Sequence, residues 1–378
     1  MNGIYFVLYI CLFISIIIKM VEKNFRLSSQ IWVVIYSVFL FYLILGVKLM
    51  DLASVEQAIK FLVDNNYYIT GFLLFLYVYI SDMRILPMLK TVFASSVIVN
   101  IVSLILFFRN NYFGMVDYNT LVNYAIVGTK FSRLMSIFAS PNVAGFYYIT
   151  VIVFLISNIT LLKKLYIKPL IYGHILLLTC SLLLTFSRAA YIVGAIIVLG
   201  YLIFFIRKRV TTKLLLMFVV VVIMPLVLPL IYSKFYFFNK DYILNDPRLY
   251  KWVVGVEFFK KSPIIGSSLN TNISYGNWGE TFSDNQFLKW LIQFGLVGII
   301  PLLILMFNIL SLSVKQYFQK NKDYFKVFSF FTIFFIGCSL NNFMEFFPVN
   351  IYLIILATIT IKHKEKIVNQ CDEGLTSK

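Results

Sequence analysis

Long apolar runs constrain this chain more than any other feature of its sequence. Runs of about 17–25 residues with few charges recur from one end of the sequence to the other. A helix rises 1.5 Å per residue, so a run of this length crosses a hydrocarbon core of roughly 30 Å. The 61% share of hydrophobic residues and the 13% share of charged residues also fall outside the usual range of soluble domains. We therefore expect an all-α, polytopic integral membrane protein.

Hydropathy predicts about eleven transmembrane helices, within a range of ten to twelve. The spans are expected at about 3–18, 30–49, 67–81, 86–108, 141–161, 169–186, 189–206, 213–231, 286–310, 327–341 and 345–361. The first run lacks the small-residue cleavage site of a secretory signal, so we expect it to be retained. Without an internal repeat or a linker, residues 1–378 are expected to form a single integral membrane domain.

The charged residues indicate the orientation of the spans. Alternate loops and the C-terminal tail hold 20 of the 33 lysines and arginines but six of the 16 acids. The positive-inside bias makes that side cytoplasmic, with the N-terminus outside and the C-terminus inside. This distribution accounts for the net charge of +17 without nucleic acid, because no basic stripe is interleaved with aromatic residues. The longer segments 50–66, 109–140 and 232–285 then lie on the extracytoplasmic face.

Two arginines on that outer face are the main candidates for binding an anion. Arg188 belongs to a Thr-Phe-Ser-Arg motif at the corner between two spans, and Arg248 opens a short amphipathic helix expected near 246–261. A guanidinium group can bind two phosphate oxygens at once and keeps its charge. The alternatives are a snorkelling arginine at 188 and a helix that anchors on anionic lipid at 248.

The large loop subdomain at 232–285 holds further polar candidates. Lys251 shares a helix face with Arg248, and the Ser-Pro-Ile-Ile-Gly motif at 262–266 is expected to break the helix and shape the loop. Asp284, at the outer mouth of the span expected at 286–310, is either a helix N-cap or a carboxylate that takes a proton from a sugar hydroxyl. Glu280 and Glu257 are reserve bases.

The histidines and cysteines exclude other chemistry. His174 lies within a span and His363 in the cytoplasmic tail, so a histidine base or a His-rich metal site on the outer face is excluded. Three of the four cysteines fall in spans, and no disulfide framework follows from their positions. No glycine-rich phosphate loop supports ATP-driven chemistry.

Four motifs in order resemble the O-antigen ligase/polymerase superfamily. They are the segments at 138–145, 184–190, 248–266 and 284–298, and the resemblance covers roughly residues 130–300. It implies a metal-independent, inverting membrane glycosyltransferase of the C-type fold class, without a cofactor, in the inner membrane of a bacterium. The donor and the acceptor would be oligosaccharides on undecaprenyl pyrophosphate, used for O-antigen (lipopolysaccharide) or capsule, and a chain-length regulator is a further candidate partner.

The resemblance also assigns roles to residues. Arg188 and Arg248 would hold the pyrophosphate leaving group, with Arg133 and Lys251 as helpers, and Asp284 is our candidate for the base. The remaining candidates for substrate binding are Asn142, Glu280 and Asn285.

One departure from the family pattern separates two functions. Ligases that attach O-antigen to lipid A-core carry a histidine at the position of Asp284, so the aspartate favours a polymerase of repeat units. A ligase that transfers finished glycan is the nearer alternative. A transporter of lipid-linked glycan is the more distant one, since transporters place polar residues and broken helices near the midplane.

Overall fold

The computed structural model is helical over the part of the chain that it describes. That part comprises residues 14–15, 18, 43–50, 54–58, 85–112, 133–135, 138, 140–205, 247–267, 285–300, 303, 324–340 and 353. The labelled helices are α5 (Ile85–Tyr112), α7 (Pro141–Ser157), α8 (Ile159–Leu162), α9 (Lys168–Leu184), α10 (Arg188–Phe205), α14 (Pro247–Lys261) and α16 (Tyr324–Leu340). Residues 43–50 and Gln286–Ile300 are also helical, and no strand occurs within the described ranges. The expected all-α fold class is confirmed for these residues.

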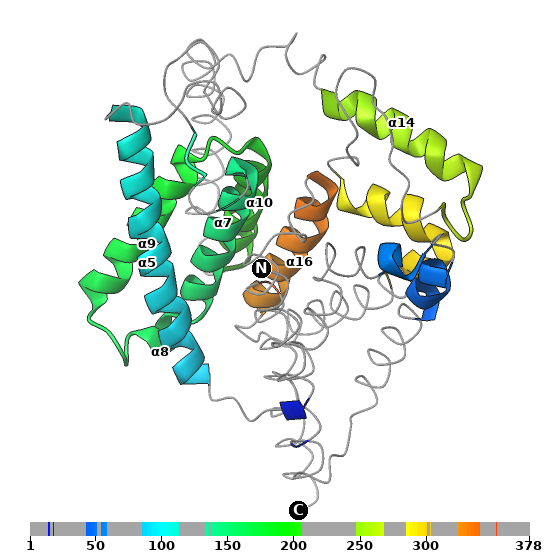
Figure 1. The fold of residues 1–378 in the computed structure, drawn as a ribbon. Helices are drawn as coiled ribbons and strands as arrows, with labels where there is room; N and C mark the ends of the chain where they lie inside the picture. The colour runs from blue at the N-terminus through cyan, green and yellow to red at the C-terminus, as the bar shows by residue number, and fades with distance from the viewer. Residues whose placement is uncertain are drawn as a thin grey trace, which may run out of the picture.

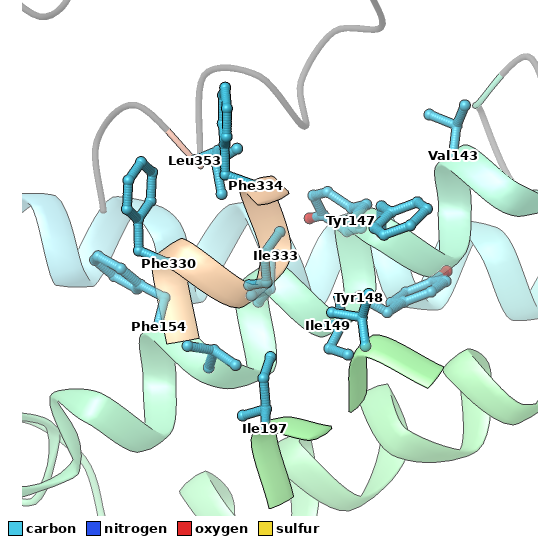
Figure 2. Packing of buried hydrophobic residues seen from close by; sticks show 14 of the residues in the cluster. Val143, Tyr147, Tyr148, Ile149, Phe154, Ile197, Phe330, Ile333, Phe334 and Leu353 are labelled. Carbon is cyan, nitrogen blue, oxygen red and sulfur yellow. The ribbon is translucent and has the colours of Figure 1, made fainter. Parts of the chain in front are cut away.

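Helix α7 lies at the centre of the bundle. It contacts α5, α9, α10 and α16 (Figure 1). Its aromatic residues Tyr147, Tyr148 and Phe154 are completely buried, and Figure 2 shows them near Ile333 of α16 and Ile197 of α10. The outer helices α5 and α9 instead expose many of their apolar side chains. This is the distribution expected of a bundle in lipid, where the outer faces need not be polar.

Apart from α14 and residues 55–58, the described helical residues fall within or overlap the expected spans. Among the described residues, one helix, Pro87–Arg109, is long and apolar enough to cross a membrane, and five shorter apolar helices occur at Pro141–Ser157, Lys168–Leu184, Arg188–Gly200, Gln286–Ile300 and Phe328–Leu340. The spans expected at 3–18, 30–49, 67–81, 213–231 and 345–361 lie wholly or mostly outside the described residues. The count of eleven and the orientation of the termini therefore stay predictions.

One expected span is divided in two. The span predicted at 141–161 corresponds to α7 and the four-residue α8, which are separated at Asn158. Asn158 leaves the helical conformation, with φ −115° and ψ 20°, and its side-chain amide donates to the carbonyl oxygen of Phe154 at 2.9 Å. This side-chain hydrogen bond competes with the regular ladder, which is why asparagine ends helices.

A buried polar seam joins α5 to α9. Ser96 Oγ and His174 Nε2 share a hydrogen bond of 2.8 Å, and Ser181 Oγ donates to Asn100 Oδ1 at 2.5 Å. All four side chains are buried. Hydrogen bonds of this kind are one of the forces that associate helices in lipid.

Small residues let α7 and α10 approach closely. A Cβ atom added to Gly145 of α7 would lie 2.8 Å from Ala190 Cβ and 2.9 Å from Ser187 Cβ. Neither neighbour is a flexible side-chain end, so the two helix backbones would have to separate. Gly194 of α10 also lies close to α7, where a Cβ atom would meet Ile149 Cδ1 at 2.9 Å, but this atom is the end of a flexible side chain that can shift.

This contact predicts opposite effects for two glycine substitutions. Gly145→Ala should lower stability by about 1–3 kcal/mol, because overpacking a rigid contact has a cost of that order. The control is Gly173→Ala in α9, where a new Cβ meets nothing within 4 Å. It should be neutral or slightly stabilising, since alanine favours helix over glycine. Thermal unfolding of the two purified variants in detergent provides the measurement, and equal shifts would contradict the prediction.

Candidate functional site

The Thr-Phe-Ser-Arg motif forms a tight corner between α9 and α10. Phe186 has a φ of +48°, a left-handed conformation that costs a non-glycine residue roughly 1–2 kcal/mol. Thr185 Oγ1 accepts a hydrogen bond of 3.3 Å from the backbone N–H of Ser187. Ser187 Oγ accepts one of 3.4 Å from the N–H of Ala190 and so caps α10. The corner places Arg188, which is half-buried, in the first turn of α10.

Arg133 holds this corner through its guanidinium group. Its Nε atom donates to the carbonyl oxygen of Thr185 at 2.9 Å, and its Nη2 atom donates to that of Phe186 at 3.0 Å. The same Nη2 atom also donates to Asn142 Oδ1 at 3.1 Å. The next residue adds a backbone hydrogen bond of 2.9 Å, from the N–H of Leu134 to the carbonyl oxygen of Leu184. These bonds fix the strained backbone that directly precedes Arg188.

The Ser-Pro-Asn motif at 140–142 is the third segment that meets at the corner, after 133–135 and 185–188. Ser140 caps α7, since its side chain accepts from the N–H of Val143 at 3.3 Å, and Pro141 occupies the first turn, where no donor is lost. Asn142 then points its amide oxygen at Arg133. Three segments that are separate in the sequence, at 133–135, 140–142 and 185–188, therefore meet at one end of the bundle.

The corner brings together two cations and the start of a helix. Arg133 is hydrogen-bonded to the carbonyl oxygen of Phe186, two residues before Arg188, and the first turn of α10 adds the positive end of a helix dipole. An arginine in the first turn of a helix, near a second arginine, favours an anionic ligand.

A second group of candidates lies on α14 and on the helix Gln286–Ile300, which are side by side (Figure 1). Leu288 and Ile292 pack against an apolar face of α14 formed by Trp252, Val254, Phe258 and Phe259. Gly255 marks the closest approach, because a Cβ there would lie 2.8 Å from Leu288 Cδ2. α14 covers the stretch expected to be a short amphipathic helix near 246–261.

Asn285 caps the helix Gln286–Ile300. Its Oδ1 atom accepts from the N–H of Leu288 at 3.0 Å, and its carbonyl oxygen accepts from the N–H of Lys289 at 3.0 Å. The sequence left Asp284 as either the N-cap of this helix or a base, and the N-cap in the structure is Asn285. Asp284 itself lies outside the described residues.

The same helix is locally broken at Gly295, where φ is +63°. The N–H groups of Leu296 and Val297 bond to the carbonyl oxygens of Pro263 and Ile264, at 2.9 Å and 3.1 Å, in place of partners one turn back in their own helix. We call residues 262–267, which fill the break, the clasp. The clasp therefore satisfies the backbone donors that the break releases, as an apolar environment requires.

Two hydrogen bonds from the clasp also satisfy an acceptor that the break releases. Ser267 donates to the carbonyl oxygen of Ile292 from its backbone N–H at 2.7 Å and from its hydroxyl at 2.8 Å. Gly266 also has a positive φ, of +73°, and a Cβ there would lie 2.5 Å from the backbone of Gln293. The Ser-Pro-Ile-Ile-Gly motif, expected to shape the loop, thus packs its backbone directly onto a helix.

Lys48 reaches the clasp from a distant part of the chain. Its Nζ atom donates to the carbonyl oxygens of Gly266 and Ser267, at 2.9 Å and 3.2 Å. The side chain is 6% exposed and belongs to the helical residues 43–50 (blue in Figure 1). Sequence reasoning missed this residue, and its only signal was a lysine in the last turn of an apolar run.

The structure places five of the predicted site residues in two groups. Arg133, Asn142 and Arg188 meet at the corner, while Lys251 on α14 and the cap Asn285 belong to the pair of helices described above. The side chain of Arg248, together with Asp284 and Glu280, lies outside the described residues. The reserve base Glu257 is exposed and pairs with Lys260 at 2.7 Å. Within the described ranges, no group of three or more His, Cys, Asp or Glu side chains is arranged to hold a metal ion.

These features define a helical, membrane-associated protein with an arginine-bearing corner. Residues 174–303, about a third of the chain, match the family model described as O-antigen ligase. The matched region contains most of α9, the corner, α10, α14 and the clasp, and it confirms the resemblance to the O-antigen ligase/polymerase superfamily. It supports a glycosyltransferase-like enzyme of polysaccharide biosynthesis that acts on lipid-linked glycans. No curated protein matches the chain.

The corner predicts that Arg133 matters for stability. Arg133→Ala leaves the carbonyl oxygens of Thr185 and Phe186 without their charged donor and should destabilise the protein by about 1–3 kcal/mol. Arg109→Ala, at the exposed end of α5, is the matched control and should change stability by less than about 0.5 kcal/mol. Thermal unfolding in detergent compares the two, and a shift no larger for Arg133→Ala than for the control would refute the assignment.

Proposed function

We propose that the protein is a polymerase of oligosaccharide repeat units carried on undecaprenyl pyrophosphate, working on the extracytoplasmic face of the bacterial inner membrane. The observation that carries this proposal is the corner at 185–188, which presents Arg188 from within the region matched to the O-antigen ligase family. The products would be O-antigen or capsular chains. Donor and acceptor would both be lipid-linked units.

In the proposed reaction a hydroxyl oxygen of the acceptor sugar attacks the anomeric carbon of the donor. The bond from that carbon to the pyrophosphate oxygen breaks, its electron pair stays on the pyrophosphate, and the hydroxyl proton passes to a base. Attack from the face opposite the leaving group inverts the anomeric configuration. Negative charge therefore develops on the pyrophosphate, and the transition state is stabilised by cations placed there beforehand.

Arg188 and Arg248 are the groups that we assign to this charge. Arg188 is supported by its position directly after a corner that the hydrogen bonds of Arg133 and Thr185 hold in place. Arg248 is supported by its position at the second residue of α14, with Lys251 one turn further on. Each such donor typically contributes about 10²–10³-fold in rate. No metal ion is required in this scheme.

For Arg133 the hydrogen bonds favour a supporting role over phosphate binding. Its Nε and Nη2 atoms are directed at the corner and at Asn142. We therefore propose that Arg133 and Asn142 position Arg188, which refines their earlier assignment as substrate-binding residues.

The acceptor side is assigned to the start of the helix Gln286–Ile300. Because Asn285 caps this helix, Asp284 is not needed for capping, and we propose it as the base, with Glu280 beside it in the acceptor site. Pyrophosphate is a good leaving group, so loss of the base should cost less than loss of an arginine. The aspartate, in place of the ligases' histidine, also favours a polymerase.

A deletion strain distinguishes the polymerase from the ligase named by the family model. Loss of a polymerase should leave a single repeat unit on the final acceptor, whereas loss of a ligase should leave none. Gel electrophoresis of the surface polysaccharide shows which pattern occurs.

A reconstituted assay distinguishes an enzyme from a transporter. Purified protein that is given lipid-linked units without nucleotide should form polymer, and transport without polymer would contradict the enzyme assignment.

Arginine substitutions test the site. In the complemented deletion strain, Arg188→Ala should abolish the ladder of long chains at unchanged protein level, and Arg188→Lys should lose at least about 10²-fold in activity because an ammonium cannot reproduce the planar fork. Arg109→Lys, an exposed arginine at the end of α5, should keep the normal ladder. A full ladder from Arg188→Lys would show that paired contacts to phosphate are not what Arg188 provides.

A further inference from the structure

Lys48 is a buried cation whose position the reaction scheme above does not explain. Its ammonium group lies 2.9 Å from the carbonyl oxygen of Gly266 and 3.2 Å from that of Ser267, and the side chain is 6% exposed. A buried ammonium is costly unless its donors are satisfied. The two carbonyl oxygens, more than 200 residues away in sequence, supply such partners.

The bonds of Lys48 fall on the part of the chain that fills the broken helix. Gly266 O also accepts from Ser262 Oγ at 2.8 Å, and Ser267 is bonded twice to the carbonyl oxygen of Ile292. That carbonyl belongs to the last turn before the break at Gly295, where a helix carries partial negative charge. A cation beside the clasp therefore favours both the loop conformation and the end of the half-helix.

The clasp continues directly from α14. α14 ends at Lys261, and the clasp begins at the next residue, so a fixed clasp fixes the end of α14. The packing of Trp252, Val254, Phe258 and Phe259 against Leu288 and Ile292 is apolar and lacks directionality, apart from the close approach at Gly255. Directional hydrogen bonds through the clasp thus limit how far α14 can slide or tilt on its partner.

We propose that Lys48 is a positioning residue that sets the placement of α14, and with it Arg248 and Lys251, relative to the span that begins at Asn285. The placement stands on the hydrogen bonds alone, whereas its consequence for chain extension rests on the proposed function. Lys48 would then keep the cations of the donor side at a constant distance from the acceptor side while glycan chains of different length pass through the site.

A pair of engineered cysteines measures the placement without any assay of activity. Gly255→Cys together with Leu288→Cys suits a disulfide, because the second substitution removes the Leu288 atoms that a Cβ at position 255 would meet at 2.8 Å and 3.3 Å. The four native cysteines are first replaced by alanine. Copper phenanthroline then oxidises the pair in native membranes, and the thiols that remain are counted by a maleimide that shifts the protein on a gel.

Three lysine variants are compared in this background. Lys48→Met removes the donors but keeps the length of the side chain, and it should slow disulfide formation about tenfold, in line with the strength of hydrogen bonds to a charged group. Lys48→Arg restores a cation with donors and should recover most of the rate. Lys260→Met is the control, because Lys260 is exposed and forms an ion pair with Glu257 on the same helix. This substitution should leave the rate unchanged.

The same lysine variants are tested for chain extension in the complemented deletion strain. The proposal expects Lys48→Met to shorten or remove the polysaccharide ladder at normal protein level, and Lys48→Arg to restore it. Unchanged disulfide formation in Lys48→Met, or slowed formation with a normal ladder, overturns the proposal. If the wild-type gene itself does not lengthen the polysaccharide while the disulfide rates still follow Lys48, the proposed function fails and the placement by Lys48 stands.

Discussion

The hydrogen bonds from Arg133 to the carbonyl oxygens of Thr185 and Phe186 show the constraint on which the described site depends. In an apolar environment, every backbone group that a helix releases must find another partner. The chain leaves the helical conformation at the corner between α9 and α10, where Phe186 adopts a strained φ. Arg133, from a separate segment, stabilises this conformation because its guanidinium group donates to carbonyl oxygens that have no acceptor role in a helix at this point. Arg188 owes its position to that arrangement.

The break at Gly295 obeys the same rule with different means. There the partners of the released N–H and C=O groups are themselves backbone groups, from the clasp, and Lys48 binds the clasp from outside. The corner lies in the bundle around α7, and the clasp lies between α14 and the helix Gln286–Ile300. Both irregular points fall within the region that matches the O-antigen ligase family. The matched region therefore includes two irregular backbone features, the corner and the break at Gly295, as well as charged residues.

Much of the fold could be predicted from the sequence, because apolar runs and the polar residues between them indicate where helices in lipid begin and end. The start of α7 after Ser140 and the turn at 185–187 followed from local residue types. The partners of those residues did not follow. Arg133 was expected to contact phosphate, and its donors to Thr185 show a contact that only the three-dimensional arrangement reveals. Asn285, rather than its neighbour Asp284, caps the following helix, a choice between adjacent residues that spacing alone does not determine. Lys48 escaped notice because its acceptors are main-chain atoms, which leave no trace in side-chain identity.

The polar seam between α5 and α9 has a consequence for how the bundle tolerates motion. Its two hydrogen-bonded pairs, Ser96 with His174 and Asn100 with Ser181, lie one turn apart on α5. A shift of α9 by a single residue would rotate its side chains by about 100° and misalign both pairs together. The two pairs therefore fix the register of α5 against α9, and any rearrangement of the bundle that keeps both pairs has to move the two helices as one rigid unit.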